Sequence, residues 1–201
     1  MDFVISDTHF DHGNIIDYCD RPYDSVEEMN EDLVANWNAV VGEDDEVVFL
    51  GDLTMADDFG EFSTWVERLN GTIQFVLGDH DEWVMPTLDG VEIRETYQFD
   101  YEGVPFYCVH DPEDAPGNWR GWVLHGHHHN NWPDQFPFVN PDERRVNVSV
   151  ELIEYTPLAL PALLDCITRF TWLDSPRRRR PVTRRLTSAR LFYRPRGRFD
   201  W

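Results

Sequence analysis

The sequence contains no lysine, and all 17 of its basic residues are arginine. They stand against 38 Asp and Glu residues, which gives a formal net charge of −21. Residues 1–168 hold 36 of these carboxylates and only six arginines. A surface so acidic repels a phosphate backbone, so we do not favour nucleic acid as a partner of this part. The composition is typical of a salt-rich cytoplasm, where like charges are screened, although a cationic ligand is the alternative.

Cysteine and long apolar runs are also scarce. The three cysteines, Cys19, Cys108 and Cys166, show no CxxC spacing. A disulfide scaffold is therefore not expected, and a reducing compartment fits. No run of 18 apolar residues occurs, and the first residues lack the pattern of a signal peptide. We expect a cytoplasmic protein without a membrane span.

The basic charge gathers at the end of the chain, where residues 169–201 hold 11 arginines and two aspartates. The expected organisation is one domain over residues 1–166 and a poorly ordered Arg-rich tail over residues 167–201. The tail has three interpretations: an arm that binds nucleic acid, a strap on the acidic body, or a change of reading frame.

Strand and helix patterns alternate in the first half of the chain, and strands dominate the second half. Such an order favours two packed sheets with helices outside. Strands are expected at residues 3–5, 46–50, 73–77, 91–93, 97–101, 104–109, 122–124 and 146–150, and helices at residues 59–69 and 157–164.

The first long helix has clear end signals. Ser25 and Glu28 form a capping-box pattern at its start, and Gly42 is the expected end. Apolar residues at helical spacing predict the face toward the core: Val26, Met29, Leu33, Trp37 and Val40.

Seven of the eight histidines lie with Asp or further His residues in short segments that follow expected strands, and His12 follows Asp11. Imidazole and carboxylate at successive strand ends are what a metal site with mixed nitrogen and oxygen ligands requires. The segments are Asp7-Thr8-His9, Gly51-Asp52, Gly78-Asp79-His80-Asp81, His110-Asp111 and His125-Gly126-His127-His128-His129.

These five blocks, in this order, resemble the signature of calcineurin-like metallophosphoesterases. The stretches around Asn14-Ile15-Ile16, Arg21-Pro22-Tyr23 and Asn147 to Val150 are similar to a small prokaryotic branch of that family. The resemblance spans about residues 1–166 and implies an α/β fold, an αββα sandwich of two mixed β-sheets flanked by helices. The metals would lie above the strand ends.

The resemblance implies a dinuclear phosphoesterase that acts on a small phosphorylated substrate, a phosphate mono- or diester. Two divalent metals about 3.5–4 Å apart clamp the phosphate oxygens and convert a bridging water into an attacking hydroxide. Manganese is the first expectation, with iron, zinc or nickel as alternatives. The implied ligands are Asp7, His9 and His129 for the first metal, Asp79, His110 and His127 for the second, and Asp52 as the bridge.

The same resemblance implies catalytic roles for two further residues. His80 would protonate the leaving-group oxygen as general acid. Asp81 would accept the other ring N–H of His80 and raise its pKa.

Asp79 departs from the family, which usually has Asn at this position. Asp keeps the metal-binding oxygen, loses the amide donor and adds a negative charge where an anionic substrate binds. This change favours metal binding over phosphate binding, or it belongs to the general acidity of the chain.

Five further residues were considered for the site. His12 would meet substrate or cap the turn before Asn14. His127 and His129 would share one face of an extended segment, which leaves His125 and His128 as non-ligands. Arg21 and Arg120 would hold a phosphate oxygen, or would form surface ion pairs with nearby carboxylates.

Two other functions compete with this interpretation. One is a nuclease of the same family that acts on polynucleotide ends, and the acidic body argues against it. The other is a non-catalytic metal-binding module that docks a partner protein. Such a module would have lost ligands, whereas only position 79 departs from the pattern here.

Overall fold

The computed structural model describes residues 1–55, 59–81 and 90–173. The strands are β1 (Phe3–Ile5), β2 (Glu46–Phe49), β3 (Thr72–Val76), β4 (Val91–Arg94), β5 (Tyr97–Tyr101), β6 (Val104–Cys108), β7 (Trp122–His125), β8 (Val139–Asn140), β9 (Arg145–Asn147) and β10 (Leu158–Ala159). The helices are α1 (Gly13–Tyr18), α2 (Val26–Val40), α3 (Phe59–Val66) and α4 (Leu160–Leu173), with short 3-10 helices η1 (Pro112–Asp114) and η2 (Val150–Leu152).

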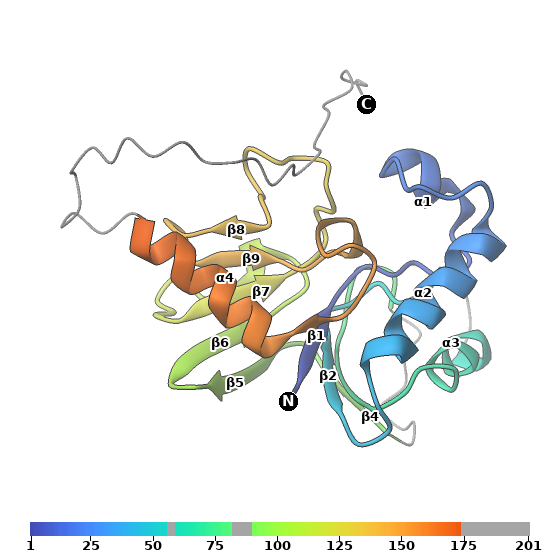
Figure 1. The fold of residues 1–201 in the computed structure, drawn as a ribbon, viewed down its shortest axis with the longest axis horizontal. Helices are drawn as coiled ribbons and strands as arrows, with labels where there is room; N and C mark the ends of the chain where they lie inside the picture. Colours follow the sequence, from blue (N-terminus) through green and yellow to red (C-terminus); the bar gives the residue numbers. More distant parts are fainter. Residues whose placement is uncertain (56–58, 82–89, 174–201) are drawn as a thin grey trace.

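The strands form two mixed sheets of five strands each, in the orders β10-β1-β2-β3-β4 and β5-β6-β7-β9-β8. Within the first sheet β1 to β4 are parallel, and β10 pairs antiparallel with β1. Within the second sheet β6, β7 and β9 are parallel, and β5 and β8 are antiparallel edge strands. Helices α2 and α3 cover one face of the first sheet, and α4 packs on the second sheet (Figure 1).

The central strands are apolar on both faces because each face is covered. Alternate residues of β2 divide between two cores: Val47 and Phe49 join the cluster under α2 and α3, and Val48 faces the second sheet. The cluster between the sheets also contains Leu124 of β7 and Leu163 of α4. These contacts confirm the expected α/β sandwich of two mixed sheets with flanking helices.

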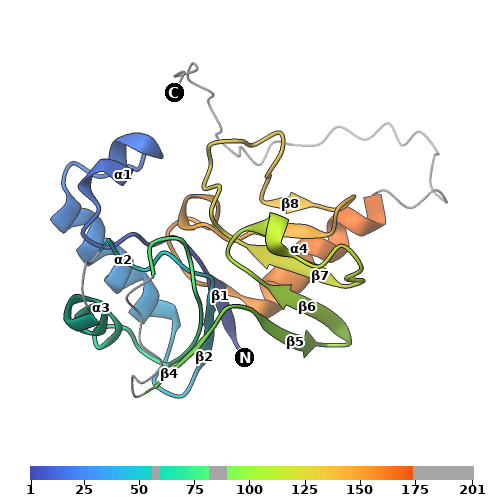
Figure 2. The same ribbon diagram turned by 180° about the vertical axis from the view of Figure 1, so that it is seen from behind.

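The carboxyl ends of the parallel strands meet at one edge of the sandwich. An isolated parallel bridge between Ser6 and Ser149 joins the two sheets there. Its hydrogen bonds run from the Ser6 N–H to the Val148 carbonyl (3.1 Å) and from the Val150 N–H to the Ser6 carbonyl (3.2 Å). Segments that follow β1 and β9 are thus held side by side, as the view from behind in Figure 2 also shows for β1 and the second sheet.

Helix α2 begins and ends as expected, from the N-cap Ser25 to a C-cap at Val41, directly before Gly42. Ser25 is its N-cap, and its hydroxyl accepts a hydrogen bond from the Glu28 N–H at 3.2 Å. The prediction that Val40 faces the core is wrong, since Val40 is 41% exposed. The helix ends at Val40, and Val41, in extended conformation, turns inward in its place.

The end of the chain also differs from the prediction. Pro157 does not open the last helix, because Leu158 and Ala159 first pair with β1 as β10. Helix α4 then continues to Leu173, beyond the expected end at Leu164. The strand expected at residues 146–150 stops at Asn147, where the chain leaves β9 to reach the first sheet. Residues 174–201 of the Arg-rich tail lie outside the described residues.

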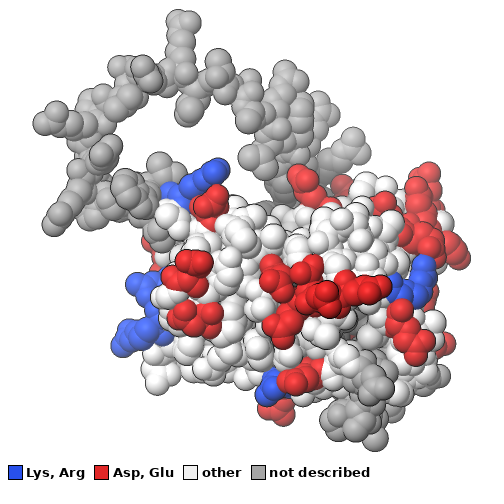
Figure 3. Space-filling model, turned by 60° about the horizontal axis from the view of Figure 1, so that its bottom comes forward, with Lys and Arg blue, Asp and Glu red and all other residues white. Residues whose placement is uncertain are grey.

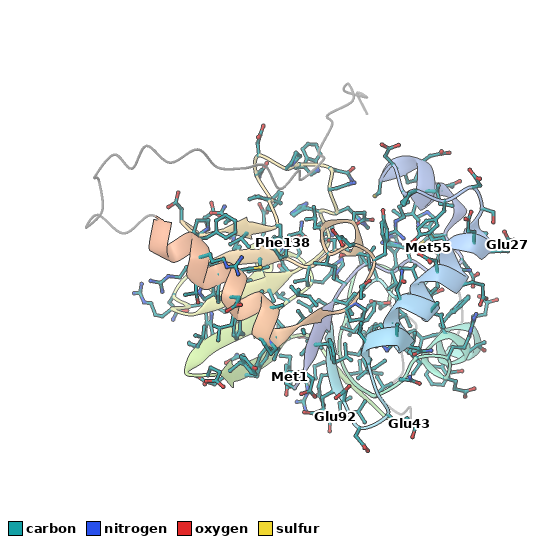
Figure 4. All side chains as sticks on the ribbon, viewed as in Figure 1. Met1, Glu27, Glu43, Met55, Glu92 and Phe138 are labelled. Atoms are coloured by element: carbon teal, nitrogen blue, oxygen red, sulfur yellow. The ribbon has the colours of Figure 1, made fainter. Side chains whose placement is uncertain are left out.

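Acidic side chains are spread over the surface, as Figure 3 shows for one face. Glu27 on α2 and Glu43 beyond it point away from the core (Figure 4). Among the described residues, no helix is long and apolar enough to cross a membrane.

Candidate metal centre

Three of the expected ligands form the first donor group, which consists of Asp7, His9 and His129. One ligand atom from each residue lies within 4.8 Å of the others, and all three residues are buried. Asp7 and His9 follow β1, and His129 follows β7 of the other sheet. This group therefore exists only because the two sheets meet at this edge.

The second donor group consists of Asp79, His110 and His127, whose ligand atoms meet the same limit of 4.8 Å. They follow β3, β6 and β7, respectively. The nearest atoms of His127 and Asp79, Nδ1 and Oδ2, are 3.4 Å apart. Two imidazole nitrogens and one carboxylate oxygen are a donor set that suits a divalent transition metal.

Asp52 lies between the two groups. Its Oδ2 atom is 3.5 Å from His9 Nε2 and 3.3 Å from His110 Nε2, so one carboxylate oxygen faces a nitrogen of each group. Both Nε2 atoms are buried and have no hydrogen-bond partner. A buried nitrogen without a hydrogen-bond partner destabilises the folded state unless a ligand binds it. Two cations on either side of Asp52 would satisfy both.

The backbone at these residues is strained. Asp7, His9, Asp52, His127 and His129 all adopt left-handed conformations, with φ between 48° and 68°. Such angles are uncommon outside glycine and cluster at functional sites. All five residues contribute a ligand atom to the donor groups at this edge of the sheets.

Hydrogen bonds fix the orientation of the ligand rings. His110 Nδ1 lies 2.7 Å from the Leu50 carbonyl and therefore donates its proton there. His129 Nδ1 lies 3.0 Å from the Glu151 carboxylate and donates in the same way. With Nδ1 as the proton donor, Nε2 of each ring is the atom left to bind a metal, the arrangement usual for histidine ligands.

Close-packed glycines leave room for these carboxylates. A Cβ atom on Gly78 would lie 2.6 Å from the Asp52 nitrogen, and one on Gly126 would collide with the Asp7 carboxylate. Both glycines belong to the sequence blocks that carried the family resemblance. Their small size lets the strand ends approach.

The comparisons with known proteins agree with this geometry. The family model described as calcineurin-like phosphoesterase matches residues 3–176. The chain belongs to this family. The resemblance inferred from the five sequence blocks is thereby confirmed.

Relatives within the family extend over most of the chain. The uncharacterized protein MJ1445 of Methanocaldococcus jannaschii is 43% identical over 169 residues, which cover 83% of this chain and 91% of that protein. The Gene 66 protein of Mycobacterium phage L5 is 27% identical over 156 residues, 62% of this chain and 75% of that protein. The crystal structure of AQ665 from Aquifex aeolicus, titled a protein of unknown function, shares the fold. It matches with a TM-score of 0.59 and 21% identity over 82% of this chain and 98% of that one.

Arg21 does not face the candidate metal centre, contrary to the expectation of substrate contact. Its side chain is fully enclosed and forms an ion pair with Glu151, with 2.7 Å between Nη2 and Oε1. The guanidinium also donates to the carbonyls of Asp7 and Thr8, each at 2.8 Å. All of this lies beneath the ligand loop, so Arg21 holds the loop and Glu151 in place. The alternative of a surface ion pair is also wrong, because the pair is buried.

Glu151 is a residue that the sequence analysis missed. Its Oε1 accepts from Arg21 and from His129, a first-group ligand. Burial alone would raise the pKa of Glu151, but Arg21 and His129 lower it to about 2. The one available signal was a carboxylate inside the apolar run from Val148 to Ile153.

The same segment contributes a second missed contact. Ser149 Oγ lies 2.8 Å from Asp7 Oδ2 and 2.7 Å from Asn147 Oδ1. The Asn147 amide donates to the His129 carbonyl at 3.0 Å. This explains why the Asn147 to Val150 stretch belongs with the ligand blocks: it supports ligands of the first donor group.

The buried carboxylates of the site stabilise positive charge on the histidines beside them. Burial lowers the pKa of His110, but Asp52 and Asp7 outweigh it and raise the value to about 10. Burial likewise lowers the pKa of His129, and Asp7 and Glu151 raise it to about 11. The carboxylates therefore draw protons onto rings whose nitrogens point at the centre. Bound cations would supply the same charge.

Asp81 does not orient the His80 ring, so that prediction is wrong. Its Oδ2 accepts from the N–H groups of Asp52 and Gly78, each at 2.7 Å. Burial and the charge of Asp52 raise the pKa of Asp81 to about 6. Asp81 is buried and holds the backbone of Asp52 and Gly78 instead.

His80 lies at the mouth of the site. The residue is exposed, and its ring centroid is 5.5 Å from that of His9. Its N–H donates to Asp52 Oδ1 at 2.9 Å, and its side chain belongs to neither donor group. The ring is therefore close to the centre and accessible to a substrate.

The segment from His125 to His129 is not extended as expected. Left-handed turns at His127 and His129 send these two rings to different donor groups. His125 is buried, with Nδ1 2.9 Å from the Gly126 carbonyl. The His128 ring stacks on Phe136 with 3.5 Å between centroids. Neither belongs to a donor group among the described residues.

His12 and Arg120 have different positions relative to the centre. His12 Nδ1 lies 3.3 Å from His9 Nδ1, and its side chain does not cap α1. His12 therefore flanks the first donor group. Arg120 is exposed and precedes β7, whereas His127 follows that strand. The expectation that Arg120 contacts substrate is wrong, because it lies at the opposite end of the sheet.

Proposed function

We propose that this family member hydrolyses a small phosphate mono- or diester with two divalent cations bound. Asp7, His9 and His129 hold one cation, and the second donor group holds the other. The observation that carries the proposal is the Asp52 oxygen, which faces Nε2 of His9 at 3.5 Å and Nε2 of His110 at 3.3 Å. Two cations in such a site neutralise phosphate oxygens and activate a water for attack.

The residues around the two cations have separate roles in the proposed mechanism. Asp52 bridges the groups. The backbone N–H of His80 donates to its carboxylate, and the Asp81 carboxylate accepts from its backbone N–H, so both hold Asp52 in place. Glu151 orients His129 and keeps its Nε2 available. His80, accessible and outside both donor groups, protonates the leaving-group oxygen.

Metal titration combined with a substrate screen tests the function. The chelated protein is reloaded with Mn²⁺, Fe²⁺, Zn²⁺ or Ni²⁺, and bound metal is measured by elemental analysis, with manganese expected to give the highest activity. We expect two metals per chain and hydrolysis of at least one class in a panel of phosphomonoesters and phosphodiesters. An Asp52→Asn variant serves as the matched control and should lose metal and activity together. Two bound metals without hydrolysis of any ester would refute the proposed phosphoesterase activity and favour the alternative, a non-catalytic metal-binding module.

Asp79→Asn should lower KM for p-nitrophenyl phosphate and leave kcat similar or higher at saturating metal. The Asp79 side chain is 63% exposed beside His127, where its charge opposes an anionic phosphate. The amide restores a donor and removes that charge, although it binds the second metal more weakly. Steady-state kinetics at high salt and saturating metal measure the effect. A slower variant that needs more metal and shows no gain in KM would mean that the carboxylate is needed as a ligand.

A further inference from the structure

A cavity of about 370 Å³ opens beside the second donor group. Its walls come from the end of β3, the turn between β4 and β5, the end of β6 and η1. The lining residues are Leu77, Gly78, Asp79, Glu95, Thr96, Val109, His110, Asp111 and Asp114.

The polar part of this lining is strongly acidic. Four of the nine described lining residues are carboxylates, and none of these nine is arginine. The neighbouring Arg94 is engaged elsewhere, with Nη2 2.6 Å from Glu92 and its guanidinium over the Tyr97 ring. Beyond the second donor group, Glu95, Asp111 and Asp114 therefore line the cavity, and no arginine belongs to its described lining.

The cavity is continuous with the proposed metal centre. Asp79 and His110 belong to both, and the buried Nε2 of His110 has no hydrogen-bond partner. Asp111 also lines the cavity, and its Oδ2 lies 3.9 Å from His127 Nε2. A phosphate held at the second donor group would place its ester substituent at the cavity mouth.

We propose that this acidic cavity selects phosphate esters whose alcohol part carries a primary ammonium group. The inference rests on the proposed function, because the phosphate is placed by the metal centre. The ammonium donates up to three hydrogen bonds, which Glu95, Asp114 and the Thr96 hydroxyl accept. Leu77 and Val109 contact the methylene chain that joins the ammonium to the ester oxygen.

Other alcohol parts fit this lining less well. An anionic group would meet like charge from Glu95, Asp111 and Asp114. An uncharged group would remove water from those carboxylates without replacing its hydrogen bonds. A quaternary ammonium prefers aromatic faces, and the described residues of the lining offer no aromatic ring other than the His110 imidazole.

Phosphonates test the selection without turnover, because their P–C bond is not hydrolysed. Binding to the metal-loaded protein is measured by calorimetry for 3-aminopropylphosphonate against butylphosphonate and for 5-aminopentylphosphonate against hexylphosphonate. Each pair differs in an ammonium that replaces a methyl group. We expect the amine to bind at least about tenfold more tightly in one or both pairs, with the ratio falling as salt rises.

Variants that replace a carboxylate by its amide test which residues cause the preference for the amine. Glu95→Gln combined with Asp114→Asn should reduce the ratio several-fold, whereas Glu113→Gln, an exposed neighbour outside the lining, should keep it. Equal affinities within both pairs, or a preference that survives the double variant, would overturn the inference. A third Mn²⁺ per chain that the double variant loses would also overturn it, since the cavity would then be a metal site. Failure of ester hydrolysis alone would refute the proposed function but not this binding result.

Discussion

Replacing His80 with alanine is expected to lower kcat by about 10²–10⁴-fold while both metals stay bound. The exposed ring stands next to His9, with 5.5 Å between centroids, and lies outside both donor groups. The contact that His80 makes with Asp52 is through its backbone N–H, which alanine keeps. Removal of the ring therefore takes away a proton donor without disturbing the bridging carboxylate.

A leaving-group series separates this role from others. The loss should be large for alkyl esters, whose leaving oxygen needs a proton, and small for p-nitrophenyl esters, which leave without one. Elemental analysis of the variant checks that metal content is unchanged. An equal loss across the series, or a missing metal, would place His80 in metal or substrate binding instead.

Glu151→Ala is expected to lower the free energy of unfolding by about 3–5 kcal/mol, because it leaves the enclosed Arg21 charge unpaired. It should also weaken metal binding at the first donor group by about 10–100-fold, because His129 loses the acceptor that orients it. Chemical denaturation of the metal-free protein and metal titration measure the two effects separately.

Two matched variants make this prediction specific. Glu31 pairs with Arg68 at the same distance of 2.7 Å, but its side chain is 69% exposed. Glu31→Ala should therefore cost less than about 1 kcal/mol and leave metal binding unchanged. The double change Arg21→Met with Glu151→Leu removes both buried charges and should recover much of the stability but not the metal affinity. Recovery of both would mean that Glu151 acts on the fold alone.

Several features of this protein follow from local sequence. Apolar runs such as Phe3–Ile5 and Glu46–Phe49 specify strands, and the polar residues directly after them can lie only at strand ends. Because parallel strands present their carboxyl ends at one edge, Asp7 and Asp52 were bound to meet if the strands paired. The start of α2 at Ser25 is equally local, since the Ser25 hydroxyl and the Glu28 N–H that donates to it lie three residues apart.

The tertiary structure decided which way these residues point and what supports them. Left-handed turns at His127 and His129 assign the two rings to different donor groups, and no local pattern distinguishes such a turn from a continued strand. Asp81 is adjacent to His80 in sequence but is drawn to the N–H groups of Asp52 and Gly78. The prediction that Asp81 pairs with the His80 ring, which rested on their adjacency in the sequence, was therefore wrong.

The support beneath the ligands depends on the longest-range contacts. Arg21 and Glu151 are separated by 130 residues, and Glu151 comes two residues after Ser149, where the bridge to Ser6 joins the two sheets. The sequence by itself determined the donor types and their order at the strand ends, because strand formation and residue chemistry are local. Only the tertiary structure determined that Arg21 is a buried partner of Glu151, because burial and pairing of charges depend on which distant segments fold together.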